Sequence, residues 1–236
     1  MKILLIFTLH LISGPVSCND VVGFPQGAVI IFCNHQPRGE KKYFCEVKTH
    51  KCAYMRPNTQ DQEYRFTVLD STGDLTVIYR NLSLQDAGSY QCGEVGLWNH
   101  DVNLKMISDP CCSSPNTVAG YLGENVTISC SYPEKFETSI KDLFKANGQA
   151  FSIEIVTKGS QKGRYSISED RSSKSFSVRI SDVREDDRGV YYCGVWSEGK
   201  SVSYYSLYTE TRLQVTEEPE LNTASFSIFS PELNVV

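Results

Sequence analysis

Cysteine is the residue type in this chain with the most chemistry to offer, and there are nine of them. A free thiolate can act as a nucleophile or metal ligand, whereas paired cysteines cross-link the chain. Two of the nine end related motifs, D-A-G-S-Y-Q-C at residues 86–92 and D-R-G-V-Y-Y-C at residues 187–193. In an antiparallel sandwich, a tyrosine two residues before a strand cysteine turns its hydroxyl toward the preceding corner, while the cysteine forms a core disulfide. The repeated motif therefore predicts structural sulfur chemistry and an internal duplication.

The N-terminal segment predicts export. Residues 1–18 carry one lysine, an apolar run too short to cross a bilayer, and small residues before Cys18, as in a secretory signal peptide. Its removal leaves eight cysteines, an even number that indicates disulfides in an oxidising compartment. No later apolar run reaches the roughly 18 residues of a membrane span. We expect no transmembrane helix in this chain, and a secreted location or one on the extracellular face of the plasma membrane.

The remaining cysteines predict four bridges. Each sandwich would have one pair joining its two sheets, a third pair would link adjacent short strands, and a fourth would lie in the Pro-flanked segment D-P-C-C-S-S-P-N. This last pair has two readings, a bridge between neighbours in the chain or cross-links in a disulfide-linked dimer, and we favour the first. The expected pairs are Cys33 with Cys92, Cys130 with Cys193, Cys45 with Cys52, and Cys111 with Cys112.

Strands must position these cysteines. The segment G-A-V-I-I-F-C at residues 27–33 alternates apolar residues, and G-E-N-V-T-I-S-C at residues 123–130 repeats the pattern. Turn signals recur roughly every 8 to 12 residues, and no segment reads as a long amphipathic helix. The sequence predicts an all-β chain of two tandem sandwiches, at residues 19–108 and 117–216, joined by a linker at 109–116. Residues 217–236 are expected to be a disordered tail.

Composition argues against catalysis and nucleic-acid binding. The formal net charge is −5, so neither sandwich attracts polyanions by bulk charge. No histidine pair has metal-ligand spacing, and neither a Gly-x-Ser-x-Gly motif nor a phosphate loop is present. We expect no enzyme activity and no cofactor.

Basic residues gather in the middle of the first sandwich. Strand alternation would project several of them onto one face, where a local positive patch favours anionic partners, either phosphate headgroups or an acidic protein surface. The alternative is a solvated face whose lysines discourage edge aggregation. The residues are Arg38, Lys41, Lys42, Lys48 and Lys51.

A tryptophan marks the predicted loop between the last two strands of this sandwich. Leu97, Trp98, Asn99 and Asp101 belong to the segment L-W-N-H-D. A tryptophan at a loop tip anchors interfaces or enters a headgroup layer. The alternative is that Trp98 packs on its own strands, while Asn99 and Asp101 are turn residues.

Two sequons predict glycans. Asn81 begins N-L-S and Asn125 begins N-V-T, and both fall near strand ends. A glycan at either position would prevent a flat protein interface there.

The segment K-K-Y-F-C, with a second cysteine at Cys52 and with D-A-G-S-Y-Q-C-G, resembles the V-type immunoglobulin domains of the polymeric immunoglobulin receptor and of leukocyte mono-immunoglobulin-like receptors. The likeness covers residues 20–216, and the D-P-C-C linker is similar to that of multi-domain members in fishes. It implies two tandem V-type immunoglobulin β-sandwiches. The implied function is extracellular immune recognition of immunoglobulin or anionic phospholipid headgroups, through the loops of domain 1 and its C–C′ face. The alternative is a soluble decoy or an adhesion spacer without signalling.

The resemblance also assigns roles to single residues. It implies structural ion pairs of Arg65 with Asp86 and of Arg164 with Asp187. W-N-H-D is loosely similar to the W-F-N-D loop of T-cell immunoglobulin and mucin receptors, which holds Ca²⁺ against a phospholipid. Asn99 and Asp101 are thus a candidate calcium pair, although His100 interrupts it. The chain departs from the family in lacking the tryptophan of strand C.

Overall fold

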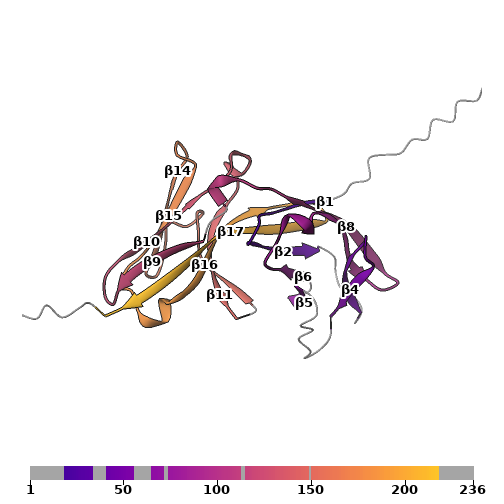
Figure 1. Ribbon diagram of the computed structural model, residues 1–236, viewed down its shortest axis with the longest axis horizontal. Helices are drawn as coiled ribbons and strands as arrows, with labels where there is room; N and C mark the ends of the chain where they lie inside the picture. The colour runs from indigo at the N-terminus through magenta and orange to yellow at the C-terminus, as the bar shows by residue number, and fades with distance from the viewer. Residues whose placement is uncertain are drawn as a thin grey trace, which may run out of the picture.

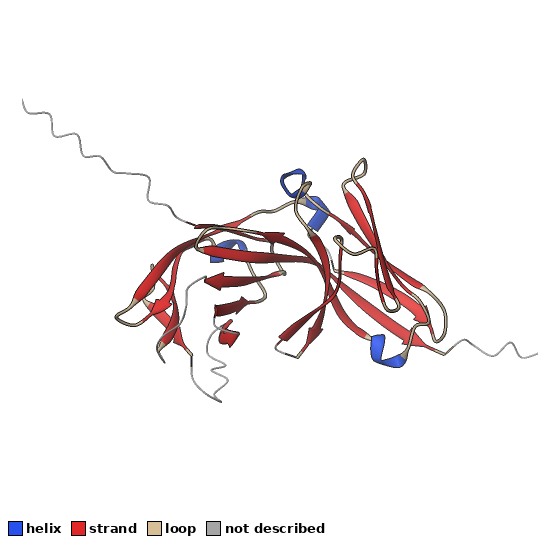
Figure 2. Ribbon diagram, turned by 180° about the vertical axis from the view of Figure 1, so that it is seen from behind, coloured by secondary structure: helices blue, strands red, loops and turns tan. Residues whose placement is uncertain are grey.

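The computed structural model describes residues 19–33, 41–55, 65–71, 74–112, 115–148 and 150–217. The predicted signal peptide, Arg38 and the tail beyond residue 217 lie outside these ranges. Strands dominate the described residues (Figures 1 and 2). None of the helices described there is long and apolar enough to cross a membrane.

In the first half, up to residue 108, the described residues form eight strands. They are β1 (Asn19–Gly23), β2 (Ala28–Cys33), β3 (Lys42–Glu46), β4 (Lys51–Tyr54), β5 (Phe66–Ser71), β6 (Asp74–Tyr79), β7 (Gly88–Glu94) and β8 (Trp98–Met106). One sheet has the order β1-β8-β7-β3-β4, and β2, β6 and β5 face it in a second sheet. The Cys33–Cys92 disulfide joins β2 to β7 between the sheets.

In the second half, from residue 115 on, the described residues form nine strands. They are β9 (Asn116–Tyr121), β10 (Val126–Ser131), β11 (Lys141–Asn147), β12 (Ala150–Val156), β13 (Gln161–Lys162), β14 (Tyr165–Asp170), β15 (Ser175–Ile180), β16 (Gly189–Ser197) and β17 (Val202–Thr216). The order β10-β15-β14-β13 forms one sheet, and β12-β11-β16-β17 lies in the other. Cys130–Cys193 joins β10 to β16. Both halves are sandwiches, as the sequence predicted.

Four short 3₁₀ turns complete the described elements: η1 (Leu84–Asp86), η2 (Pro110–Cys112), η3 (Glu134–Phe136) and η4 (Glu185–Asp187). The repeated motif folds alike at η1 and η4. Tyr90 donates its hydroxyl to the carbonyl of Asp86 at 2.8 Å, and Tyr191 does the same to Asp187 at 2.7 Å. These bonds confirm the corner that the motif predicted.

Each corner is also held by the expected ion pair. Arg65 Nη1 lies 2.9 Å from Asp86 Oδ2, and Arg164 Nη1 lies 2.7 Å from Asp187 Oδ2. Burial by itself would raise the pKa of Asp86, but the hydrogen bonds from Arg65 and Ser83 outweigh it and lower the pKa. The pKa of Asp187 is lowered in the same way by Arg164. Both carboxylates are therefore held in the ionised form.

Other aromatic rings replace the missing tryptophan of the first core. Phe44 stacks on Tyr90 with ring centroids 5.3 Å apart and meets Phe66 edge-on at 5.2 Å. Offset and edge-to-face ring pairs of this kind add to the stabilisation from buried area. The core of the first half is thus built around three rings.

The sequence did not predict the pairing between the two halves. β17 is 15 residues long; its last residues pair with β9, while its first residues pair antiparallel with β2, from Val202 opposite Cys33 to Leu207 opposite Ala28. One sheet therefore runs β12-β11-β16-β17-β2-β6-β5 through both halves. Figure 1 shows β17 reaching from the second half into the first. The two sandwiches share a sheet instead of being joined only by a linker.

The linker region forms η2, between β8 and β9. Cys111 and Cys112 are bonded to each other, and the side chain of Cys112 is buried. The structure thus has the local bridge that we favoured.

Candidate functional site

The candidate site is the outer face of the β1-β8-β7-β3-β4 sheet, the side that points away from the core disulfide. Tyr43 donates its hydroxyl to Gln91 Oε1 at 3.1 Å, and Gln91 Nε2 donates to Asp101 Oδ1 at 3.1 Å. The Tyr43 ring also lies 6.3 Å from that of exposed Tyr54. Partial burial, and then the nearby Tyr54 and Asp101, raise the pKa of Tyr43, so the phenol stays protonated and donates. Four strands thus contribute to one ordered polar surface.

The Cys45–Cys52 disulfide lies on this same face. The two cysteines are directly opposite each other in the β3–β4 register, next to the Tyr43–Tyr54 pair. A bridge between facing residues fixes the spacing of two neighbouring strands. It therefore holds the tyrosines of the outer face in position.

The structure contradicts the predicted positive patch at Lys42, whereas Lys41, Lys48 and Lys51 are exposed. Strand alternation turns Lys42 inward, where it is 1% exposed, so it cannot meet a ligand. Lys41 lies at the end of β3 beside Val95, whose N–H donates to its carbonyl at 3.0 Å. Lys48 and Lys51 are exposed at the opposite end of the β3–β4 hairpin, roughly 20 Å away at the usual rise of a strand. The described lysines are therefore split between two ends of the sheet.

The tip of the sheet is apolar and shorter than predicted. The β7–β8 turn consists of Val95, Gly96 and Leu97, with Gly96 at φ +76°. Val95 is 52% exposed and Leu97 63% exposed. Trp98 already belongs to β8, is half-buried, and donates its Nε1–H to Glu94 Oε2 at 3.1 Å. The prediction of a tryptophan at the tip is wrong, because the turn closes one residue before Trp98.

The candidate calcium pair also lies on β8 and not in a loop. Asn99 and Asp101 are both exposed, and Asp101 already accepts from Gln91. Among the described residues, the group of His, Cys, Asp and Glu side chains close enough to share an ion is Asp109, Cys111 and Cys112. Its cysteines form the local disulfide, so it offers no thiolate. Calcium binding stays a prediction.

Both sequon asparagines are exposed. Asn81 follows β6 with φ +48°, and Asn125 precedes β10. Neither lies on the outer face described above, since β6 and β10 belong to other sheets. Glycosylation at these sites stays a prediction.

The equivalent face of the second half is covered. Phe144 occupies the position of Cys45, because it pairs with Tyr192 as Cys45 pairs with Gln91. It is buried in a cluster with Leu207 and three residues from the first half, Ala28, Ile30 and Ile78. Aromatic residues of the second half, including Tyr205 with its ring 5.0 Å from Phe144, surround this cluster. This face holds the two halves together.

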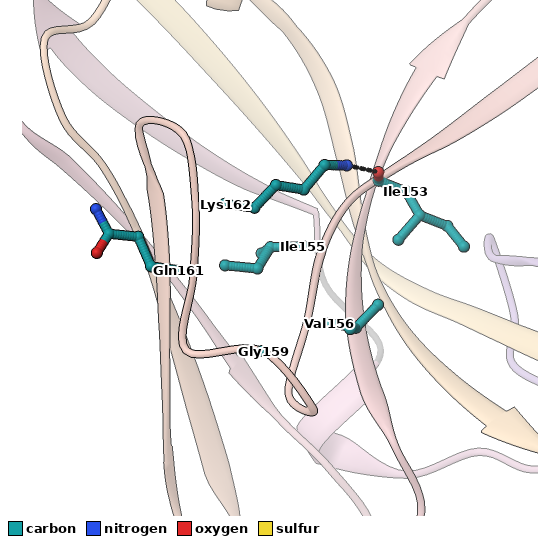
Figure 3. Close-up of a pocket in the computed structure, with 6 residues that line it drawn as sticks. All are labelled: Ile153, Ile155, Val156, Gly159, Gln161 and Lys162. Carbon is teal, nitrogen blue, oxygen red and sulfur yellow. Dashed lines mark hydrogen bonds between the residues drawn. The ribbon is translucent and has the colours of Figure 1, made fainter.

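A further hollow lies at the β12 edge of the second half, which the sequence did not predict. Its volume is about 360 Å³, and Figure 3 shows the lining side chains. Lys162 closes one side by donating Nζ–H to the carbonyl of Ile153 at 2.9 Å. The remaining lining residues are Ile155, Val156, Gly159 and Gln161.

The chain is similar to known proteins that contain immunoglobulin domains. Residues 113–216 match the immunoglobulin V-set domain. The polymeric immunoglobulin receptor of Bos taurus is 29% identical over 195 residues, which are 77% of this chain and 26% of the receptor. Human CMRF35-like molecule 7 is 30% identical over 122 residues, 50% of this chain and 57% of that protein. The ectodomain of a teleost fish polymeric immunoglobulin receptor aligns with a TM-score of 0.36 at 20% identity, covering 85% of this chain and 97% of that one.

The chain thus spans about a quarter of the length of the polymeric immunoglobulin receptors that it matches. The disulfides, the two tyrosine corners and the sheet orders described above are those expected of immunoglobulin sandwiches. The chain is therefore all-β, with two immunoglobulin-type sandwiches, a V-set domain at residues 113–216 and sequence similarity to polymeric immunoglobulin receptors and CMRF35-like molecules.

Proposed function

We propose that this chain is an extracellular immune-recognition protein, a receptor ectodomain or a secreted form, that binds an immunoglobulin through the outer face and tip of its first half. Relatives named polymeric immunoglobulin receptor match over 77% of the chain in the bovine case, so the ligand class suggested by that name is the first to test.

The observation that carries this proposal is the contrast between the two equivalent faces. The face of the second half is covered by Ala28, Ile30 and Ile78, whereas Tyr54 remains exposed on the face of the first half. That face ends in the apolar tip of Val95 and Leu97. Exposed tyrosine and apolar side chains around an ordered polar network are the composition of a protein-binding surface.

The structure favours a protein over a lipid surface as the partner. A headgroup site would need several bases beside the apolar tip. Of the four described lysines of the predicted patch, only Lys41 is exposed at that end of the sheet, since Lys42 is buried and Lys48 and Lys51 lie at the other end. Anionic phospholipid is therefore the competing outcome of the test.

The test is a biosensor measurement with the secreted chain. The surfaces are purified polymeric immunoglobulin, vesicles with phosphatidylserine, and vesicles without it. We expect immunoglobulin binding that Leu97→Asp and Tyr54→Ala each weaken about tenfold or more, as substitutions of exposed anchor residues do. Leu122→Asp, at an exposed leucine of the second half, is the matched control and should bind normally.

Three results would contradict the proposal. Binding that requires phosphatidylserine would assign a lipid ligand. Binding unchanged by both substitutions would move the site elsewhere on the chain. No binding to immunoglobulin or to either kind of vesicle would favour the decoy or spacer alternative.

A further inference from the structure

The contact between the two halves, here called the seam, is the pairing of residues 202–207 of β17 with β2. Ser206 donates its hydroxyl to the carbonyl of Val22 at 2.5 Å, and the Tyr208 and Phe24 rings lie 5.2 Å apart. Gly27 approaches so closely that a Cβ there would stand 2.1 Å from the Leu207 carbonyl oxygen. The seam is therefore packed as tightly as a protein interior.

An unpaired carboxyl group lies beside this seam. Asp142 on β11 is 0% exposed, and neither of its carboxylate oxygens has a hydrogen-bond partner. In the strand register, Asp142 lies opposite Gly194 of β16, and Gly194 lies opposite Leu207 of the seam. Buried polar groups are nearly always hydrogen-bonded, so an unpaired carboxylate at this position requires an explanation.

The repeat shows that the fold does not require an acid at this position. The equivalent residue of the first half is Tyr43, opposite Gly93 as Asp142 is opposite Gly194. Tyr43 lies on the uncovered outer face and donates a hydrogen bond. Asp142 holds the same register position on the covered face of the second half and is buried there.

Asp142 is also electrostatically close to the seam tyrosines. Burial and then Asp142 raise the pKa of Tyr205, and Asp142 contributes to the raised pKa of Tyr208 after burial and Tyr132. Tyr205 contacts Phe32, and Tyr208 contacts Phe24, both of the first half. A charge on Asp142 therefore acts on the two side chains that meet the other half.

The described charged groups of the surrounding elements do not pair with Asp142. On β11 itself, Lys141 pairs with Glu169, and Lys145 donates to the carbonyl of Asp186. Tyr192 of β16 donates to Glu210 of β17. Glu154 of β12 accepts from Ser152. Arg80, which follows β6, lies 4.9 Å from the Phe151 ring centroid, and its Nη2 has no hydrogen-bond partner. None of these groups neutralises Asp142.

We propose that Asp142 makes the seam sensitive to pH, so that the seam is tight while the carboxyl group is protonated and loosens when it ionises. Burial raises the pKa of Asp142 from 3.8 to about 7. The pKa of Asp142 is higher when β17 and β2 are paired (the closed seam) than when they are separated and the carboxyl group is exposed (the open seam). The contribution of Asp142 to the stability of the closed seam is therefore complete below about pH 4 and is lost as the pH rises to about 7. Within that window, each pH unit shifts the ratio of open to closed seam by up to about tenfold.

The test is hydrogen–deuterium exchange of the full chain, corrected for intrinsic exchange rates, at about pH 5, 6 and 7. We expect protection of the β2 and β17 amides to fall by up to about 100-fold across this range, relative to the β10–β15 pair away from the seam. Asp142→Asn should remove this pH dependence. Asp101→Asn, an exposed acid on the equivalent face, is the matched control and should retain it.

A seam protected equally at all three pH values would overturn the proposal, as would an unchanged pH dependence in Asp142→Asn. A ¹³C titration of the Asp142 carboxyl in the unmodified chain keeps the proposal testable if the variant does not fold. An apparent pKa near 7 would support it, and one near the ordinary value of 3.8 would overturn it.

Discussion

The outer faces of the β1-β8-β7-β3-β4 sheet and of the equivalent β12-β11-β16-β17 sheet have the same strand register, but the first is open and the second is covered. In each half, one residue lies on the strand opposite the residue that precedes the core cysteine. This residue is Cys45 in the first half and Phe144 in the second. Cys45 is cross-linked to the neighbouring strand, and the face around it stays open. Phe144 is buried under strands of the other half. The comparison teaches that a few residues on a duplicated sheet decide whether it becomes an internal contact or an open surface.

The two faces differ in exposure because they differ in the apolar area that covering them removes from water. Phe144, Phe151, Tyr192 and Tyr205 present four rings on the second face, and burying large rings drives association. On the first face, Gln91 and Asp101 hydrogen-bond to each other and remain satisfied beside water. The first face gains less from being covered, and the second face gains more.

The largest expected effect therefore concerns the covered face. Phe144→Ala should lower the free energy of unfolding by about 3–5 kcal/mol, because it leaves a cavity in the shared cluster. Tyr54→Ala on the open face should lower it by less than about 1 kcal/mol. Urea denaturation followed by tryptophan fluorescence measures both. Equal effects would mean that the two faces do not differ as described.

The two ion pairs give the next comparison. Arg164 is 24% exposed and Arg65 48% exposed, while their partners Asp187 and Asp86 are buried. Arg164→Met should therefore destabilise the chain by about 3 kcal/mol, because it strands a buried carboxylate. Arg65→Met should cost less, because water can reach its site.

The pH dependence of these pairs has a definite sign. The native pKa values of Asp86 and Asp187 are below 3.8, so the pairs stabilise the fold above about pH 4 and are lost as the pH falls below it. Thermal melts of the unmodified chain should drop on acidification below pH 4, and each methionine variant should show a smaller drop. A variant as acid-sensitive as the unmodified chain would contradict this assignment.

The third largest loss of stability is expected on removal of the Cys45–Cys52 disulfide of the open face. Replacing Cys45 and Cys52 together by serine should cost about 2.5 kcal/mol, because the bridge closes a loop of only eight residues. The loss should be confined to the first half. Hydrogen exchange should then quicken in β3 and β4 and stay unchanged in β11 and β12. Faster exchange in both halves would show that the bridge also supports the seam.

The sequence predicted what depends on local spacing. The corners at Tyr90 and Tyr191 follow from one heptapeptide each, and the ion pairs come from residues that the resemblance assigns. The misplacement of Lys42 shows the limit of local patterns, because a shift of one residue in a short strand exchanges its two faces. Similarly, the turn is centred on Gly96, two residues closer to the core cysteine than Trp98, the tip residue that the composition of L-W-N-H-D suggested.

The seam could not be predicted from local patterns at all. The alternation of apolar and polar residues indicates that β2 and β17 are strands, but it does not identify the strand with which each one pairs. Their pairing joins Cys33 to Val202 across most of the chain. For the same reason the burial of Asp142 had no signal in K-D-L-F-K, since the covering strands come from the other half.

The smallest expected effects compare two tyrosine hydroxyls, one on the open face and one on the covered face. Tyr43→Phe removes the bond to Gln91, a neutral acceptor on the open face, and should cost about 0.5–1 kcal/mol. Tyr192→Phe removes the bond to the Glu210 carboxylate on the covered face and should cost about 1.5 kcal/mol or more, because bonds to charged groups are stronger. Urea midpoints at constant slope resolve such differences. If Tyr43→Phe proved the more costly of the two, the polar chain of the open face would be a structural element in its own right and not only a surface for recognition.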